Sequence, residues 1–167
     1  MNVLNRRSIN SLAGAICAGL LGYAYHLQFN QGMEPCPLCI FQRVALIALG
    51  VTFIVAAAHH PRIWGARIYA ALIGIVALGG ALVAGRHAWL QQLPPDRVPE
   101  CGPGLEYILG VFPLSDALRM VFEGSGECAE VDWMFLGLSM PAWVLAWFLV
   151  LGCVGVCANL LTPRRAS

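Results

Sequence analysis

Apolar residues are concentrated in four long stretches of the chain, and no charged residue lies near the middle of any of them. An α-helix needs about 20 apolar residues to cross the hydrocarbon core of a bilayer. The stretches meet this length and run over about residues 8–29, 40–58, 66–85 and 141–161. The pattern therefore predicts an all-α membrane protein, in which residues 1–167 form one domain built as a bundle of four transmembrane helices.

The connections between the predicted helices differ greatly in length. A short loop over about residues 30–39 joins the first two helices, and a long loop over about residues 88–140 precedes the last. Within the long loop, residues 114–122 have helical spacing, with apolar side chains on one side and Asp116 and Arg119 towards the other. This spacing predicts a short amphipathic helix that lies on the membrane surface.

The composition also indicates a membrane protein. Hydrophobic residues make up 59% of the chain and charged residues 11%, whereas an average soluble domain has about 45–50% and about 25%. A soluble chain of 167 residues with so few charges would expose large apolar patches to water. The composition therefore excludes an ordinary soluble globular protein, and no nucleic-acid partner is expected.

All ten basic residues are arginines, and their distribution predicts the orientation of the chain. The segments on one side of the predicted membrane carry six arginines and no acid, whereas the other side carries four arginines and all nine acids. Because cytoplasmic loops are enriched in positive charge, we expect an inner-membrane protein with both termini in the cytoplasm and the long loop in the periplasm. The six arginines are Arg6, Arg7, Arg62, Arg67, Arg164 and Arg165.

The seven cysteines fall into two groups under this topology. Four lie on the predicted periplasmic side, where exposed thiols pair or react because the compartment is oxidising. The expected pairs are Cys36 with Cys39 and Cys101 with Cys128. The other three lie within the first and last spans, where a buried cysteine behaves as a small, inert hydrophobic residue. These are Cys17, Cys153 and Cys157.

Residues 36–39 form a Cys-x-x-Cys motif, which occurs in structural disulfides, in zinc sites and in redox centres. A disulfide that closes so small a ring removes little chain entropy. A tetrathiolate zinc site would need a second closely spaced pair, which Cys101 and Cys128 do not provide. Cys39 begins the second predicted helix, where backbone amides and the helix dipole favour a thiolate. The position therefore favours a redox centre, and no metal site is expected.

Two basic residues near Cys39 also favour a redox site. Arg43 follows Cys39 by one helical turn, and an arginine just inside a span is costly unless it reaches the head groups. We expect its guanidinium to stabilise a thiolate at Cys39 and a reduced electron acceptor beside it; a simple interfacial anchor is the alternative. His87 ends the third predicted helix on the same side and could hydrogen-bond the acceptor; an incidental histidine at the interface is the alternative.

Electrons taken from thiols need an acceptor, and the sequence restricts the choice. The chain contains no Gly-x-Gly-x-x-Gly fingerprint and no Cys-x-x-Cys-His haem-attachment motif. A lipid-soluble quinone needs no large binding domain, since it can lie between helix ends near the interface. The expected cofactor is therefore ubiquinone or menaquinone, bound beside Cys39, Arg43 and His87.

Several segments closely resemble the disulfide bond formation protein B (DsbB) family, and the resemblance extends over nearly the whole chain. Residues 35–43 read PCPLCIFQR, residues 85–91 read GRHAWLQ, and residues 126–130 and 133–141 read GECAE and WMFLGLSMP. The resemblance implies an inner-membrane thiol oxidase that re-oxidises a soluble, DsbA-like partner of thioredoxin fold and passes the electrons to quinone. A relay of DsbA, DsbB and quinone is the established route that keeps a bacterial periplasm oxidising.

The resemblance also implies a role for each periplasmic cysteine. Cys101 would form the mixed disulfide with the partner, and Cys128 would be the disulfide mate of Cys101. Cys36 would attack this loop pair and carry the reducing equivalents inward. Cys39 would interact with the quinone, with Arg43 and the nearby histidine beside it.

Two other interpretations stay open at this stage. An enzyme of the vitamin K epoxide reductase type also uses a four-helix bundle, a quinone and two cysteine pairs. Its Cys-x-x-Cys is expected at the final span, however, whereas here the motif precedes the second. The other interpretation is a four-span metal-binding or scaffold protein with a thiolate cluster, which metal analysis and thiol titration would distinguish from an enzyme.

Overall fold

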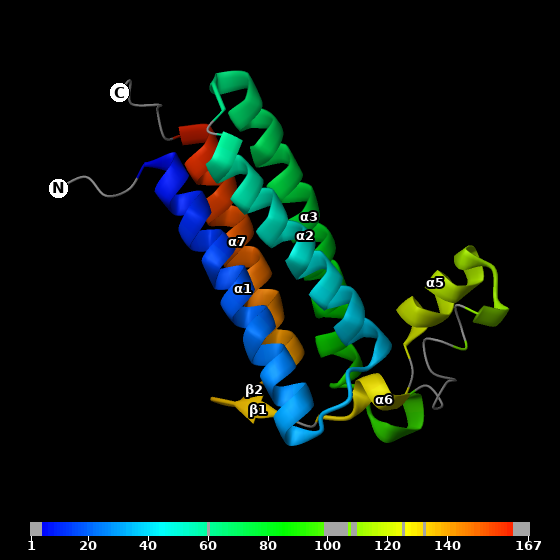
Figure 1. Ribbon diagram of the computed structural model, residues 1–167. Helices are drawn as coiled ribbons and strands as arrows, with labels where there is room; N and C mark the ends of the chain where they lie inside the picture. Colours follow the sequence, from blue (N-terminus) through cyan, green and yellow to red (C-terminus); the bar gives the residue numbers. More distant parts are fainter. Residues whose placement is uncertain are drawn as a thin grey trace.

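The structure is a computed structural model, and it describes residues 5–59, 61–98, 107, 110–124, 126–131 and 133–161. Four long helices run side by side and form a bundle (Figure 1). They are α1 Arg6–Gln31, α2 Pro37–His59, α3 Ile63–Leu90 and α7 Met140–Leu161. Each is long and apolar enough to cross a membrane, and each contains one of the predicted spans. The predicted all-α membrane fold is thus confirmed.

Local sequence explains how the first two helices are bounded. The side-chain oxygen of Asn5 accepts a hydrogen bond from the amide of Ser8 at 2.8 Å, which caps the start of α1. Gly32 ends α1 with a φ of 67°, a left-handed value that glycine adopts without steric cost. Pro37 begins α2, since proline at the first helical position has no amide hydrogen to leave unpaired. The short loop between them places Cys36 directly before α2.

Small residues allow the helices to pack closely, with α3 against α7, α1 against α2 and α2 against α3. At Gly80 of α3, an added Cβ would lie 2.3 Å from Cε1 of Phe148, whose ring is fully buried on α7. At Gly155 of α7, an added Cβ would lie 2.6 Å from Cε1 of Phe53 on α2. Both aromatic rings therefore depend on a facing glycine for their space.

The outward surface of the bundle is apolar. Large hydrophobic side chains are exposed on all four long helices, for example Leu12 on α1, Ile54 on α2, Ile75 on α3 and Leu149 on α7. A water-soluble protein rarely exposes so much contiguous apolar surface. Together with the four candidate spans, this surface identifies a multi-pass membrane protein whose helices contact lipid.

The start of α1 and the end of α7 lie at one end of the bundle, here called the terminal end (Figure 1). The elements of the long loop lie at the opposite end, here called the loop end. These elements are the 3-10 helix η1 Pro95–Arg97, the helices α5 Leu114–Glu123 and α6 Gly126–Ala129, and the strands β1 Met134–Phe135 and β2 Leu138–Ser139.

Buried polar contacts join the helices at the terminal end. Asn10 on α1 and Asn159 on α7 exchange hydrogen bonds through their side-chain amides, at 3.2 and 3.0 Å. The guanidinium of Arg6 on α1 donates to the carbonyl oxygen of Pro61, between α2 and α3, at 3.0 Å. A polar group in hydrocarbon has no water to bind, so these contacts fix α1 against the other helices.

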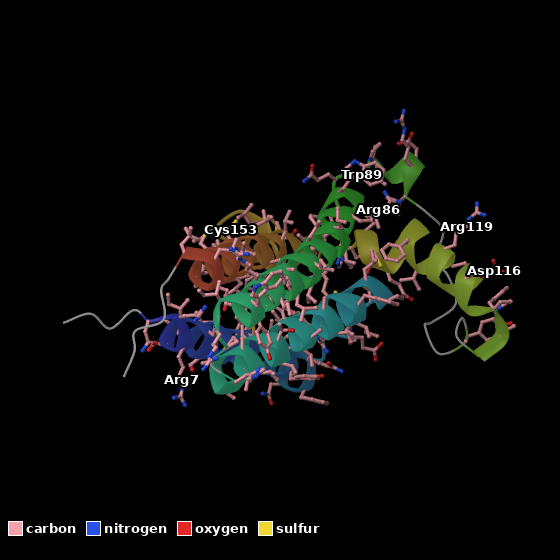
Figure 2. The ribbon with its side chains drawn as sticks, turned by 90° about the horizontal axis from the view of Figure 1, so that it is seen from above. Arg7, Arg86, Trp89, Asp116, Arg119 and Cys153 are labelled. Carbon is pink, nitrogen blue, oxygen red and sulfur yellow. The ribbon has the colours of Figure 1, made fainter. Side chains whose placement is uncertain are left out.

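Helix α5 confirms the short helix predicted within the long loop. Asp116 and Arg119 lie on its exposed side and point away from the four-helix bundle (Figure 2). Val121 is buried on the opposite side. Gly124 ends the helix with a φ of 87°.

A two-stranded antiparallel hairpin between α6 and α7 was not predicted. Met134 of β1 pairs with Ser139 of β2. The two residues of the turn, Leu136 and Gly137, have φ values of 51° and 79°, and tight two-residue turns need such positive values. Leucine rarely adopts them, so this pair of residues is a weak sequence signal for a turn.

Candidate active site

The Cys-x-x-Cys motif is wound into the first turn of α2. The amide of Ile40 donates to the carbonyl oxygen of Cys36 at 3.2 Å, so helical geometry begins at the first cysteine and brings the two thiols together. The Sγ atoms of Cys36 and Cys39 lie 3.3 Å apart. A disulfide bond is about 2.05 Å long, so the structure describes two thiols, and the Cys36–Cys39 disulfide stays a prediction.

His87 of α3 faces both cysteines across the interface between α2 and α3. Its Nε2 atom lies 3.8 Å from Cys36 Sγ, and its Nδ1 atom lies 3.9 Å from Cys39 Sγ. The sequence placed this histidine at the outer end of a span, whereas α3 continues to Leu90 and leaves the side chain only 3% exposed. His87 is therefore a neighbour of the thiols, and its contact with a quinone stays a prediction.

Gln42 orients the ring of His87, a contact that the sequence pattern did not single out. Its side-chain Nε2 lies 2.9 Å from His87 Nδ1, with donor and acceptor set by the histidine tautomer. The side chain is only 5% exposed. One signal for it was present, because a polar side chain inside a span is expensive and usually has a function.

The long loop brings a third cysteine to the same place. Cys128 lies on α6 and is 1% exposed. Its Sγ, the Sγ of Cys36 and a ring nitrogen of His87 all lie within 4.8 Å of one another. Cys36 and Cys128 are thus placed for thiol–disulfide exchange, which proceeds by attack of one sulfur on another. Cys101, and with it the predicted Cys101–Cys128 disulfide, lies outside the described residues.

Side chains in the last turns of α3 and directly after it hold the segment that carries the loop cysteine. Nε of Arg86 donates to the carbonyl oxygen of Phe122, in the last turn of α5, at 3.1 Å. The same guanidinium lies 4.4 Å from the ring centroid of Trp89 (Figure 2). The side-chain amide of Gln91 donates to the carbonyl oxygen of Glu130 at 3.0 Å. The two hydrogen bonds bracket the loop cysteine along the chain.

An apolar cluster surrounds the thiols at the loop end, separate from the core of the bundle. Leu90 of α3 packs against Gly124, where an added Cβ would lie 2.5 Å from Leu90 Cδ1. The rings of Phe41 and Phe122 pack with their centroids 6.3 Å apart. The cluster shields the sulfur atoms of Cys36 and Cys128 from water. Its buried members are Cys36, Leu38, Val83, Leu90, Val121 and Cys128.

Arg43 lies one helical turn beyond Cys39 and is bound to α1. Its guanidinium donates to the side-chain oxygen of Gln28, and to the carbonyl oxygen of Ala24 at 3.4 Å. It also lies 5.0 Å from the ring centroid of Tyr25. These contacts fit an anchor between α1 and α2, and they also fix a cation on the helix that carries Cys39. Its role towards a quinone stays a prediction.

The three cysteines of the spans differ from one another. Cys17 is buried in the core of the bundle, as predicted. Cys153 and Cys157 are instead exposed on the outer face of α7, as Figure 2 shows for Cys153. Their prediction as buried residues was wrong because four positions return to the same helix face, and that face of α7 is turned towards lipid.

Comparison with known proteins identifies the family. A family model described as "Disulfide bond formation protein DsbB" matches residues 6–158. Proteins named "Disulfide bond formation protein B" include one from Methylococcus capsulatus, 54% identical over 91% of this chain and 93% of its own length. Those from Nitrosococcus oceani and Hahella chejuensis are 51% and 48% identical, over 92% and 96% of this chain and 90% and 98% of their own lengths. The chain therefore belongs to the disulfide bond formation protein B family.

Proposed function

We propose that this disulfide bond formation protein re-oxidises a DsbA-like periplasmic thiol oxidase and transfers the electrons to membrane ubiquinone or menaquinone. The observation that carries the proposal is the meeting of Cys36, Cys39 and Cys128 at the loop end of a membrane-spanning bundle. The Cys36–Cys39 pair lies at the start of a membrane-spanning helix, and Cys128 of the second pair is carried by the long loop. Electrons can therefore pass from a water-borne partner to a lipid-borne acceptor by thiol exchange.

The face of α2 that carries Cys39 suits a lipid-soluble acceptor. Cys39 is more exposed than Cys36. Cys39, Arg43 and Ile47 follow at intervals of four along one helix face, and Ile47 is 42% exposed on the outer surface of the bundle. The half-buried Arg43 offers hydrogen-bond donors for a carbonyl oxygen, so the residues present fit a quinone. A bound quinone would supply an acceptor for two electrons and two protons.

The exchange steps balance with the cysteines of this chain. Two thiols of the partner reduce the Cys101–Cys128 disulfide, and the partner leaves with a disulfide of its own. The Cys128 thiolate then attacks Cys36 in the Cys36–Cys39 disulfide, which forms a Cys36–Cys128 bond and releases Cys39 as a thiolate. This direction is the reverse of the attack by Cys36 expected from the resemblance, because at this stage the loop pair is the reduced one. Attack of Cys101 on Cys128 restores the loop disulfide and frees Cys36. Two electrons and two protons have then moved to Cys36 and Cys39.

His87 is placed to move the protons of these steps. A thiolate, and not a thiol, attacks a disulfide, so each exchange needs a group that takes or returns a proton. The ring nitrogens of His87 lie 3.8 Å from Cys36 Sγ and 3.9 Å from Cys39 Sγ. Gln42 keeps the ring in this orientation. The arrangement supports general acid–base assistance by His87.

The arginine pattern supports the proposed location in the inner membrane, with both termini in the cytoplasm. The start of α1 and the end of α7 lie together at the terminal end, so the loop end would face the periplasm (Figure 1). DsbA has a reduction potential of about −120 mV, so its re-oxidation needs a strongly oxidising acceptor such as a respiratory quinone. Membership of the disulfide bond formation protein B family favours this function over that of a vitamin K epoxide reductase.

The test mixes a reduced DsbA-like partner, the purified protein and a quinone without oxygen, and follows quinone reduction by absorbance. Cys101→Ser should abolish oxidation of the partner and still reduce quinone when a small dithiol supplies electrons to Cys36 and Cys39. Cys153→Ser, on the outer face of α7, is the control and should retain both activities. Loss of both activities in Cys101→Ser would contradict the division of labour, and absence of quinone reduction by the unaltered protein would overturn the proposal.

A further inference from the structure

Potential metal ligands meet in the reduced site. The Sγ atoms of Cys36 and Cys128 and a ring nitrogen of His87 lie within 4.8 Å of one another, and all three side chains are buried. The Sγ of Cys39 lies 3.3 Å from that of Cys36 and 3.9 Å from His87 Nδ1. The group therefore consists of three thiols and one imidazole, a donor set that proteins use for tetrahedral zinc.

The spacing of these atoms is close to that around a zinc ion. With zinc–sulfur bonds of about 2.3 Å and a zinc–nitrogen bond of about 2.0 Å at tetrahedral angles, neighbouring donor atoms lie about 3.5–3.8 Å apart. The separation of Cys36 Sγ from His87 Nε2 is 3.8 Å. The 4.8 Å limit on the pairs among Cys36, Cys128 and His87 means that none of these three pairs must close by more than about 1.3 Å to reach this geometry.

The histidine also has the outer contact that metal-binding histidines require. In metal sites, the ring nitrogen that does not bind the metal almost always donates to an outer partner, which fixes the tautomer and the ring orientation. Gln42 lies 2.9 Å from His87 Nδ1 and is buried. Its amide can be turned to accept from Nδ1–H, which leaves Nε2, on the side of Cys36, to bind the ion.

The fold supplies what the cysteine spacing lacks. The sequence did not predict a tetrathiolate zinc site, because Cys101 and Cys128 are not a closely spaced pair. In the structure, the nitrogen donor beside the thiols comes from a histidine on another helix, 51 positions beyond Cys36. No regular spacing along the chain marks such a set.

We propose that the fully reduced protein binds one zinc ion through Cys36, Cys128 and His87, with Cys39 as the fourth donor. Each thiol that binds the ion releases its proton, and a thiolate that shares a lone pair with zinc is a weaker nucleophile towards a disulfide. Oxidation of the thiols of Cys36 and Cys39 to a disulfide, with two electrons and two protons passing to quinone, removes two of the four donors. Zinc therefore inhibits disulfide exchange and is bound only by the reduced protein. The inhibition rests on the proposed function, whereas the binding of zinc does not.

The binding test uses the full-length protein in detergent, reduced with a phosphine and freed of metal without oxygen. Zinc is titrated in competition with a chromophoric chelator, and cobalt(II) serves as a spectroscopic substitute. We expect one zinc ion per reduced chain, none per oxidised chain, and a cobalt spectrum with sulfur-to-metal charge transfer and tetrahedral bands. An equal zinc content in the reduced and oxidised forms, or an octahedral cobalt spectrum, would overturn the proposal.

Substitutions test the ligand set. Cys36→Ser, Cys128→Ser and His87→Ala should each lose stoichiometric zinc and change the cobalt spectrum. Gln42→Leu, which leaves every ligand in place, should weaken zinc binding by about 10–100-fold. The control is the double variant Cys153→Ser and Cys157→Ser, whose thiols lie on the outer face of α7 and which should bind zinc as the unaltered protein does.

The result is decisive in both directions. Circular dichroism and thermal unfolding of each variant identify any loss of zinc that comes from a loss of fold. If a ligand variant does not fold, Gln42→Leu and the cobalt spectrum of the unaltered protein decide whether the zinc site exists. Retention of zinc by the Cys36 and His87 variants, or its loss in the double control, would refute the ligand set.

A second assay separates this inference from the proposed function. Quinone reduction is measured in chelator and again with added zinc. Rapid turnover in chelator without any zinc binding would refute the zinc site alone. Zinc binding without quinone reduction would refute the proposed function alone. Inhibition by zinc that chelator reverses supports both.

Discussion

Arg86 joins α3 to the last turn of α5, and its replacement should loosen the segment that carries Cys128. Its Nε donates to Phe122 O at 3.1 Å, and its guanidinium stacks over Trp89 at 4.4 Å. Arg86→Gln keeps a polar side chain but removes the positively charged guanidinium. The apolar cluster and the bond from Gln91 to the far side of the segment are retained, so the fold should persist.

The size of the effect follows from the two contacts. A hydrogen bond from a charged donor contributes about 1.5–3 kcal/mol, but this one is exposed, so about 1 kcal/mol is the appropriate figure after solvent screening. An exposed cation–π contact adds about 0.5–1 kcal/mol. Loss of the hydrogen bond alone, or of both contacts, therefore costs about 1–2 kcal/mol and raises the population of the undocked segment about 5- to 30-fold.

Thiol protection measures this population. Cys128 is 1% exposed, so an alkylating reagent reaches it only when the segment opens, and the alkylation rate follows the opening equilibrium. In the reduced protein, Arg86→Gln should raise the alkylation rate of Cys128 by about 5- to 30-fold, as read by mass spectrometry. Arg97→Gln, on the exposed helix η1, is the matched control and should change nothing. An unchanged rate in Arg86→Gln, or an equal rise in the control, would refute the docking role.

Three further predictions concern packing and the proposed acceptor. Gly80→Ala places a Cβ 2.3 Å from a ring atom of Phe148 and should lower the free energy of unfolding in detergent by about 1–3 kcal/mol. Gly79→Ala, whose Cβ would have nothing within 4 Å, should leave the free energy of unfolding unchanged, and equal unfolding midpoints for the two variants would contradict the packing argument. Asn159→Ala leaves its buried amide partner on α1 unpaired and should cost about 1–2 kcal/mol in the same assay, and no loss would show that the pair contributes nothing. Arg43→Gln should raise the apparent quinone KM or slow quinone reduction, and an unchanged rate would leave Arg43 as an anchor alone.

The hydrophobic pattern was sufficient to predict the bundle but not its boundaries. Lipid imposes apolar length on every span, so four spans were visible without any knowledge of packing. Helix α3 nevertheless runs to Leu90, because no proline interrupts it before Pro94 and polar residues at the interface do not end a helix. His87 was therefore expected at a helix end, whereas in the structure it lies within α3 as a buried neighbour of the thiols.

The parts of the site that could not be predicted depend on relative helix rotation. The contact between Gln42 and His87 requires that α2 and α3 turn particular faces towards each other, and a single sequence does not fix that rotation. The same holds for Cys153 and Cys157, because the pattern places them on one face without showing whether that face meets lipid or another helix. The proximity of Cys128 to Cys36 depends on how a long loop returns to the bundle.

The reduced site is assembled from three separate parts of the chain, and this has a consequence for biogenesis. During synthesis, Cys36 and Cys39 leave the ribosome well before His87, which follows 51 positions after Cys36, and Cys128 follows later still. With the loop end facing the periplasm, as proposed, the motif is translocated without its neighbours and is open to foreign thiols until the third helix inserts and the loop folds back. Maturation of a newly made chain should accordingly be the stage at which wrong disulfides form most readily.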